Sequence, residues 1–340
     1  MPFRSRGMLG YGLAALLVLA ACGVGQQPSG ASGSPGASTQ TGPRLGSFER
    51  PIVIAFVPSQ ETSKILKSGD TIASALSSAT GLKFKATVPI SYAATIEGMC
   101  SAKVDVAFLT PLSYVLAKDK DCAQFMTASV RDGSPTYRGQ IRVRADSGIT
   151  DVCQLKGKKF AFADPVSTSG ALYPILLFKT KCGGNTPQEF FGVNNVFYAG
   201  GHDKAMNALY SKQVDGAASF IDAKTDVPSA SLKLYADIGT VTKRIAETDD
   251  IPGDPQVARK DIPAELRDKI KQALLEYAGT AAGKKAIFDL YSIDGFAVIP
   301  DSSYDKVRDA AKIVGINIAE EASKTARPPA TVAPSPSTSP

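Results

Sequence analysis

Three consecutive hydroxyl residues stand in the segment D-P-V-S-T-S-G-A-L (164–172). Ser167, Thr168 and Ser169 lie between a proline and Gly170, and an apolar run follows them. Such a segment could cap a helix, supply a catalytic serine or bind an anion. The elements that flank it, and the other polar groups of the chain, decide between these roles.

A catalytic role requires partners that this sequence does not supply. A nucleophile elbow has the pattern G-x-S-x-G, and neither Ser167 nor Ser169 is flanked in that way. The His202-Asp203 pair could help to hold metal ions, but such sites need several histidines and the chain has one. No G-x-x-x-x-G-K-[ST] pattern is present, which excludes a P-loop. We therefore expect no enzyme activity, no metal site and no cofactor.

An anion site is consistent with the local pattern. The strand-like K-F-A-F-A (159–163) precedes the hydroxyls, and the apolar run after them contains Pro174. Proline has no N–H and is tolerated in the first turn of a helix, which puts 167–170 at a helix N-terminus. Unpaired N–H groups and the helix dipole attract oxyanions there. A single Ser or Thr would suffice for a cap, and these residues alone leave both interpretations open.

One internal match supports two related units. S-Y-A-A-T-I-E-G-M-C-S-A-K-V-D-V-A-F (91–108) aligns without gaps to G-H-D-K-A-M-N-A-L-Y-S-K-Q-V-D-G-A-A (201–218). Each segment has the pattern of a loop, a helix, a tight turn and a strand. The identities are few, and chance similarity is the alternative; if the units are related, Tyr92 and His202 occupy equivalent positions at helix N-termini and face each other across a cleft. Clefts of this kind are favoured sites for small ligands.

Strand and helix patterns alternate along the chain. Strands are expected at 51–58, 83–89, 140–145 and 159–163, and helices at 71–80, 264–278 and from 301 or 302 to 314. This alternation predicts an α/β fold with at least partly parallel sheets. The hydrophobic content of 44% suits a globular core, and a net charge of +6 without a concentrated basic stripe excludes a nucleic-acid binder.

The N-terminus has the features of an export signal. Two arginines precede a short apolar run at 8–21, which is too short to span a bilayer and ends at Cys22. The sequence L-A-A-C (19–22) resembles a bacterial lipobox, which implies cleavage before Cys22 and lipidation of its thiol. We expect a signal peptide at 1–21, a Gly/Ser/Pro-rich tether at 22–49 and a disordered Pro-rich tail at 324–340.

Four further cysteines remain after Cys22. An even number in an exported chain suggests two disulfides, for which three connectivities are possible. The spacings favour two local loops, Cys100–Cys122 and Cys153–Cys182.

Several segments together resemble one family, the phosphonate- and phosphite-binding lipoproteins of ABC importers. The matching segments are V-R-A-D-S-G-I-T (143–150), L-K-G-K-K-F-A-F-A-D-P-V-S-T-S-G-A-L-Y-P (155–174), G-G-H-D (200–203) and D-I-P-G-D-P (250–255). The resemblance spans about residues 51–315. It implies a two-lobed type II periplasmic-binding-protein fold with a ligand cleft and two hinge crossings, in which 50–139 and 251–323 form lobe 1 and 140–250 form lobe 2.

The resemblance also implies which residues bind the ligand. The hydroxyls and the helix N-terminus would grip phosphonate oxygens, the G-x-H-[DE] histidine and two tyrosines would add donors, and an acidic residue would follow a strand of lobe 2. These positions correspond to Tyr92, Tyr137, Ser167, Thr168, Ser169, His202 and Asp222. Asp250 and Thr110 are weaker candidates.

The expected function follows from this resemblance. The chain is expected to be a monomeric receptor, anchored by lipid to the outer face of the cell membrane, which binds phosphonate, phosphite or phosphate and delivers it to an ABC permease with a cytoplasmic ATPase. A receptor of the same fold for another small oxyanion or metabolite, and a phosphoester hydrolase that uses His202 and a serine, are the alternatives.

Overall fold

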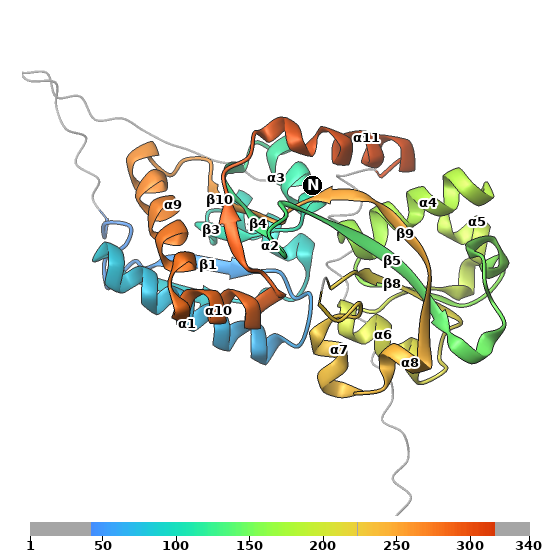
Figure 1. The fold of residues 1–340 in the computed structure, drawn as a ribbon. Coiled ribbons are helices and arrows are strands. Elements are labelled where there is room, and N and C mark those ends of the chain that lie inside the picture. The colour runs from blue at the N-terminus through green and yellow to red at the C-terminus, as the bar shows by residue number, and fades with distance from the viewer. Residues whose placement is uncertain (1–41, 223, 317–340) are drawn as a thin grey trace, which may run out of the picture. The chain divides into compact units, whose positions relative to one another are not determined.

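The structure contains two β-sheets, each covered by helices (Figure 1). It is a computed structural model that describes residues 42–222 and 224–316. We name the part around the six-stranded sheet the first lobe and the part around the five-stranded sheet the second lobe. This is the two-lobed α/β architecture predicted from the sequence. The expected signal peptide, the lipidation site Cys22 and the C-terminal tail lie outside the described residues.

The first lobe is built on a mixed sheet in which strands β2, β1 and β3 are parallel and β10 is antiparallel to its neighbours. The strand order is β11 (Gly295–Ala297), β4 (Ala123–Val130), β10 (Pro255–Arg259), β3 (Val106–Phe108), β1 (Ile52–Phe56) and β2 (Phe84–Thr87). Its helices are α1 (Thr62–Thr80), α2 (Tyr92–Cys100), α3 (Pro111–Asp119), α9 (Ala264–Gly279) and α10 (Ala281–Tyr291).

The second lobe has the strand order β7 (Val196–Tyr198), β6 (Phe160–Phe162), β8 (Gly216–Phe220), β5 (Thr136–Arg144) and β9 (Thr242–Pro252). Its helices are α4 (Tyr173–Cys182), α5 (Pro187–Phe191), α6 (His202–Tyr210), α7 (Ser229–Leu234) and α8 (Ile238–Val241). Short turns of 3-10 helix lie at Ala145–Ser147, Val152–Leu155 and Val193–Asn195, and a π turn at Thr168–Leu172 precedes α4.

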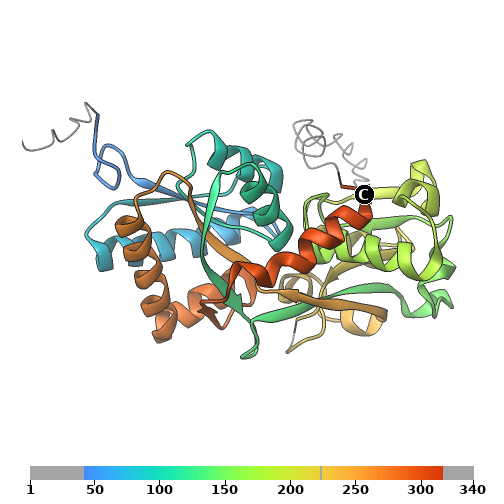
Figure 2. The ribbon, with the colours of Figure 1, turned by 90° about the horizontal axis from the view of Figure 1, so that it is seen from above.

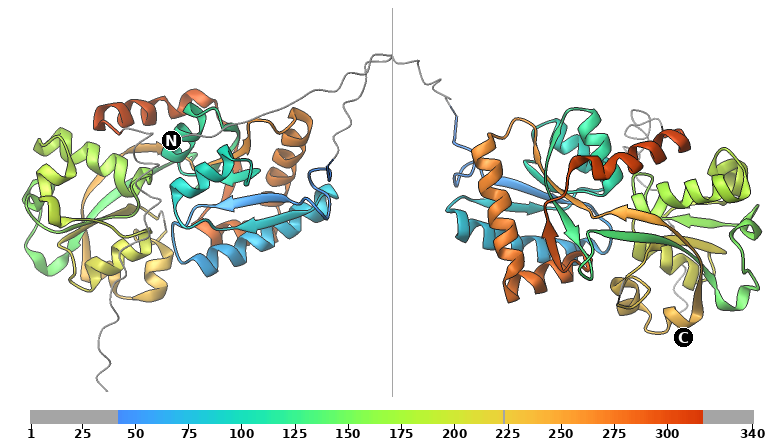
Figure 3. Two further views of the ribbon diagram at one scale, coloured as in Figure 1. Left: turned by 180° about the vertical axis from the view of Figure 1, so that it is seen from behind. Right: turned by 45° about the horizontal axis from the view of Figure 1, so that its top comes forward.

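Two chain segments cross between the lobes. The first runs from the end of β4 to β5, and the second from the end of β9 to β10. Strands β5 and β9 pair along their length, from Thr136 opposite Pro252 to Arg144 opposite Thr242. They run side by side into the second lobe (Figure 3). Gly253 is essential at the second crossing, because a Cβ atom there would meet the carbonyl oxygen of Ser129 at 2.0 Å.

Helix α11 (Asp305–Val314) also joins the two lobes, by packing rather than by a chain crossing, and the sequence did not reveal this contact. It follows the 3-10 turn Asp301–Tyr304, ends at Gly315 as expected, and packs against both α3 of the first lobe and α4 of the second (Figure 2). The ammonium group of Lys179 in α4 donates a hydrogen bond to the carbonyl of Ile313 at 2.8 Å.

Two boundaries differ from the expectations. Helix α1 begins at Thr62 rather than at 71, since Ile65 and Gly69 both face the core. The chain before β1 also contacts the first lobe: Leu45 packs against the core, and Lys83 donates its N–H to the carbonyl of Gly46 at 2.8 Å. Residues 43–49, which we assigned to the tether, are therefore held on this lobe. No helix within residues 42–222 and 224–316 is long and apolar enough to cross a membrane.

Each lobe carries one disulfide. Cys100 at the end of α2 bonds to Cys122 in the first lobe, and Cys153 bonds to Cys182 at the end of α4 in the second. These are the two local pairings that the spacings favour.

Removal of the Cys153–Cys182 disulfide should lower the free energy of unfolding. Its partners are 29 residues apart, and a loop of that size confers about 2–4 kcal/mol by restricting the unfolded chain. Urea denaturation of Cys153→Ser/Cys182→Ser measures this loss. The Cys100→Ser/Cys122→Ser variant, with partners 22 residues apart, serves as the matched comparison and should lose a similar amount. Unchanged stability in both variants contradicts the prediction.

Candidate ligand-binding cleft

The segment with three hydroxyls does begin a helix. Ser167 is its N-cap and accepts a hydrogen bond on Oγ from the N–H of Gly170 at 3.0 Å. Pro174 has no N–H to donate to the carbonyl of Gly170, and Ala163 at the end of β6 donates there instead, at 3.0 Å. The first helical turn is thereby tied to the sheet of the second lobe.

The three hydroxyls have different roles. Ser167 is fully buried and satisfies the cap, while Thr168, also fully buried, accepts a hydrogen bond on Oγ1 from the N–H of Leu112 in the first lobe at 2.8 Å. Only Ser169 lines the pocket described below. A helix cap and a hydroxyl that lines the pocket therefore coexist in one segment, with a contact between the lobes in its middle.

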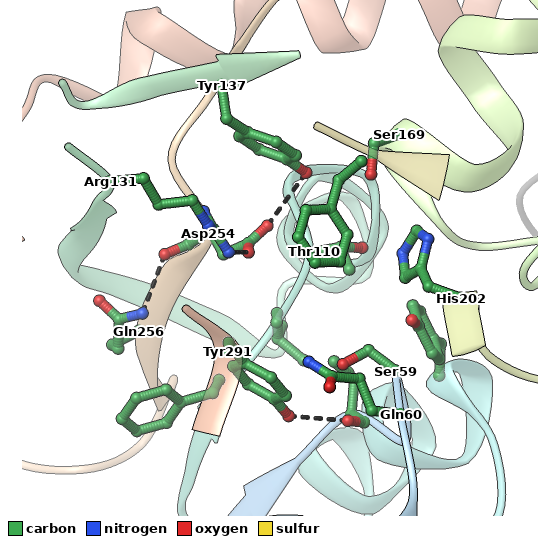
Figure 4. Close-up of a pocket in the computed structure, with 15 residues that line it drawn as sticks. Ser59, Gln60, Thr110, Arg131, Tyr137, Ser169, His202, Asp254, Gln256 and Tyr291 are labelled. Atoms are coloured by element: carbon green, nitrogen blue, oxygen red, sulfur yellow. Dashed lines mark hydrogen bonds and ion pairs between the residues drawn. The ribbon is translucent and has the colours of Figure 1, made fainter. Parts of the chain in front are cut away.

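The pocket lies between the lobes (Figure 4). Its polar lining from the first lobe and the crossings is Ser59, Gln60, Tyr92, Thr110, Arg131, Tyr137, Asp254, Gln256 and Tyr291. The second lobe contributes Ser169, His202 and Phe220, and Val57, Phe108 and Leu109 complete the wall. The space between these residues amounts to about 460 Å³ when the solvent at its mouth is included.

Tyr92 and His202 meet at this pocket from equivalent positions. Each is the first residue of a helix, α2 in the first lobe and α6 in the second. The backbone N–H of His202 donates to the carbonyl of Ser59 across the interface at 2.9 Å. The internal match in the sequence therefore corresponds to two helix N-termini that face one site.

His202 is held as a neutral ring. It is 4% exposed, its Nδ1 lies 3.3 Å from Ser219 Oγ and its Nε2 lies 3.5 Å from Ser167 Oγ. Burial, with the positive charge of Arg131, lowers its pKa from 6.5 to about 3. A neutral imidazole has a single N–H to donate and brings no charge. A Cβ atom on Gly170 would lie 2.4 Å from Ala163 Cβ and 2.8 Å from His202 Cε1, which explains the glycine there.

Both tyrosines remain protonated donors. Burial raises the pKa of Tyr92 well above its usual range, and the charge of Asp164 adds to the effect. Burial and Asp254 raise the pKa of Tyr137 in the same way. Tyr137 donates to Asp254 Oδ1 at 3.2 Å, whereas the hydroxyl of Tyr92 is buried and has no hydrogen-bond partner. An unpaired buried hydroxyl in a pocket wall is a group that a ligand can satisfy.

Arg131 and Asp254 were missed by the sequence analysis. They form an ion pair of 2.6 Å between Nη2 and Oδ2, and the guanidinium lies 4.7 Å from the ring of Tyr137. Burial opposes the charge on Arg131, but the attraction of Asp254 and its hydrogen bond, with smaller effects of Tyr137 and Asp222, together raise the pKa of Arg131. The D-I-P-G-D-P segment contains Asp254 and could have suggested it. Arg131 follows a strand without any motif.

The acidic candidates lie outside the pocket. Asp222 lines a neighbouring hollow, where Oδ1 accepts the N–H groups of Lys224 and Thr225. Asp250 is exposed on β9 and pairs with Arg138 at 2.7 Å. Thr110 does line the pocket, and it also caps α3 and donates to the carbonyl of Val166 at 3.1 Å.

The arrangement is suited to binding an oxyanion. Hydroxyl, imidazole and guanidinium donors converge on a small space between two lobes, as anion sites require. Within the described residues, no group of His, Cys, Asp and Glu side chains could hold a metal ion.

The sequence places this site in a known family. Residues 54–304 match the family described as ABC transporter, phosphonate, periplasmic substrate-binding protein. The chain belongs to this family. The phosphonate-binding family consists of the extracytoplasmic binding components of ABC transporters, in agreement with the resemblance found in the sequence.

Individual relatives give the same picture. The phosphate-import protein PhnD of Mycolicibacterium smegmatis is 29% identical over 79% of this chain and 87% of its own length. The phosphonates-binding periplasmic protein of Escherichia coli is 31% identical over 68% of this chain and 67% of its own. The structure of PhnD1 from Prochlorococcus marinus in complex with methylphosphonate has a TM-score of 0.68 at 18% identity, and covers 78% of this chain and 98% of that one. The last similarity supports the fold.

The neutral state of His202 predicts a pH dependence of stability. Its folded pKa lies below its unfolded value, so the stability linked to the neutral ring is complete above about pH 6.5 and is lost as the pH falls toward 3. Between pH 7.5 and pH 5 the wild type should lose about 2 kcal/mol more unfolding free energy than His202→Gln. Urea denaturation at both pH values measures this difference.

The comparison of wild type with His202→Gln cancels the contribution of the other titrating groups to the pH dependence. Burial raises the pKa of Asp164 to about 6, which has the opposite slope, but Asp164 is present in both proteins. His202 is the only histidine of the chain, so no other imidazole contributes. Equal losses in wild type and variant contradict a neutral buried ring.

Proposed function

We propose that the protein is a membrane-tethered receptor that binds a phosphorus oxyanion between its lobes and delivers it to an ABC permease. The unpartnered hydroxyl of Tyr92 carries this proposal, because it points to a ligand oxygen as its missing partner. Ser169 and the N–H groups at its helix N-terminus act from the second lobe, and Tyr92 acts from the first. His202 donates one hydrogen bond from its neutral ring.

The ligand class follows from the donors of the pocket. A tetrahedral anion such as phosphate, phosphite or methylphosphonate offers acceptors in several directions, which matches donors that come from both lobes. Phosphate import and methylphosphonate binding by the relatives support this class. The carboxylate of Asp254, already an acceptor for Tyr137, could also accept the P–OH proton of a monoprotonated ligand.

Lobe closure accompanies binding in this proposal. The loops that form the pocket also carry hydrogen bonds between the lobes: His202 N–H to Ser59 and Leu112 N–H to Thr168. A ligand that draws Ser169 and Tyr92 together therefore also favours these contacts. Closure is a hinge motion about the two crossings.

A ligand panel tests the proposal. Phosphate, phosphite and methylphosphonate should each be compared with sulfate by thermal shift and by isothermal titration calorimetry. At least one phosphorus compound should raise the melting temperature and bind more tightly than sulfate. If none of them binds, the proposed function is wrong. Turnover of a chromogenic phosphoester would instead support the hydrolase alternative.

Tyr92→Phe should separate affinity from stability. The variant removes a hydroxyl that has no hydrogen-bond partner within the protein, so the free energy of unfolding should stay the same or rise. The affinity for the preferred ligand should fall about tenfold, because the hydrogen bond to the ligand is lost. Calorimetric titration and urea denaturation measure the two quantities.

Tyr114→Phe is the matched control for this variant. Tyr114 is equally buried but donates to Asp301, away from the pocket. Its replacement should reduce stability and leave affinity intact. If Tyr92→Phe binds the ligand as tightly as the wild type, Tyr92 does not contact it.

Anchoring through Cys22 is the second part of the proposal and rests on the L-A-A-C sequence. Cys22→Ser should move the protein from the membrane fraction to the soluble extracytoplasmic fraction, because the acceptor of the lipid is lost. Fractionation and immunoblotting measure the distribution. Ser29→Ala in the same tether should leave it unchanged. Retention of Cys22→Ser on membranes contradicts lipidation at this residue.

A further inference from the structure

Arg131 occupies an unusual place in the pocket wall. Its side chain is 9% exposed and lies at the end of β4, where the chain first leaves the first lobe. Nη2 pairs with Asp254, but Nε and Nη1 are buried without a hydrogen-bond partner. Figure 4 shows the guanidinium beside Asp254, with Tyr137 nearby. A buried guanidinium with two unpaired N–H donors can donate hydrogen bonds to a bound anion.

Arg131 also borders a neighbouring hollow that contains the carboxylate of Asp222. It lines both the ligand pocket and the neighbouring hollow, whereas Asp222 lines only the neighbouring hollow. Asp222 is 4% exposed, and its Oδ2 has no hydrogen-bond partner. Its charge acts on Arg131, and together with the stronger effect of Asp254 it raises the pKa of that guanidinium.

These contacts determine which substituents the ligand can carry. Among the residues that line the pocket, Arg131 and Asp254 alone are charged, and they pair with each other. An ammonium group on a ligand needs a carboxylate without a cationic partner. Asp254 is already bound to Arg131, and Asp222 lines the neighbouring hollow rather than the pocket. The guanidinium itself repels a second cation.

We propose that Arg131 determines the specificity of the site: it admits phosphorus oxyanions with a small uncharged substituent or none, and it rejects those that carry an ammonium group. This inference rests on the proposed function, since it assumes that the pocket binds phosphorus oxyanions. It assigns Arg131 a role in selection, in addition to the donors that hold the oxyanion.

Two ligands of matched shape isolate the effect of the ammonium group. Propylphosphonate and 2-aminoethylphosphonate have chains of the same length, and they differ at the terminal position, which is a methyl or an ammonium group at pH 7. Isothermal titration calorimetry gives the ratio of their dissociation constants. Wild-type protein should bind propylphosphonate about tenfold or more tightly than 2-aminoethylphosphonate. Arg131→Gln should bind the two ligands with equal affinity or prefer 2-aminoethylphosphonate.

Two further variants test whether the charge of Arg131 is responsible. Arg131→Lys keeps a cation beside Asp254 and should retain the preference for propylphosphonate. Arg138→Gln removes a cation that is half exposed, pairs with Glu247 and Asp250, and does not line the pocket. It should also retain the preference, so a general effect of net charge is excluded by this control.

The outcomes distinguish this inference from the proposed function. If the wild type binds 2-aminoethylphosphonate as tightly as propylphosphonate, the inference is overturned, and this measurement does not depend on any variant folding. A ratio unchanged in Arg131→Gln, with methylphosphonate still bound, overturns it as well. If no phosphorus compound binds to the wild type, the proposed function itself has failed.

Discussion

A polar group buried without a hydrogen-bond partner reduces stability by about 1–3 kcal/mol, and this protein has such groups where its lobes meet. The hydroxyl of Tyr92 and two nitrogens of Arg131 are unpaired in the pocket wall. The stability needed to keep them comes from elsewhere, including two hydrophobic lobes and a disulfide in each. These groups are hydrogen-bond donors whose missing acceptors a bound ligand would supply.

The same loops bind the ligand and join the lobes. In the hydroxyl segment, Thr168 contacts the first lobe while Ser169 faces the pocket. At His202, the backbone N–H contacts the first lobe while the ring lines the pocket. Occupancy of the site and closure of the lobes are therefore physically coupled through adjacent atoms. Helix α11, which packs on both lobes, is a further element that any opening must accommodate.

Local signals in the sequence were sufficient for part of the fold and of the site. The apolar strand Ile52–Phe56, the helix Ala264–Gly279 and the helix start at Ser167 follow from short-range patterns, and the family resemblance gave the two-lobed architecture. The internal sequence match predicted that Tyr92 and His202 face one cleft. Both residues line the pocket, although they are far apart in the chain.

Features set by tertiary contacts could not be predicted in this way. Arg131 has no motif, and its role arises from an ion pair with Asp254 at the other crossing. Asp222 follows the strand as expected, but it lines a neighbouring hollow and not the pocket. Thr168 looks like an anion donor in the sequence, yet its hydroxyl is used between the lobes. A crystal structure with bound methylphosphonate tests the account most directly. The account predicts phosphonate oxygens within about 3.2 Å of the Tyr92 hydroxyl, of Ser169 and of the His202 ring. A ligand bound elsewhere, with the Tyr92 hydroxyl still unpaired, would contradict it.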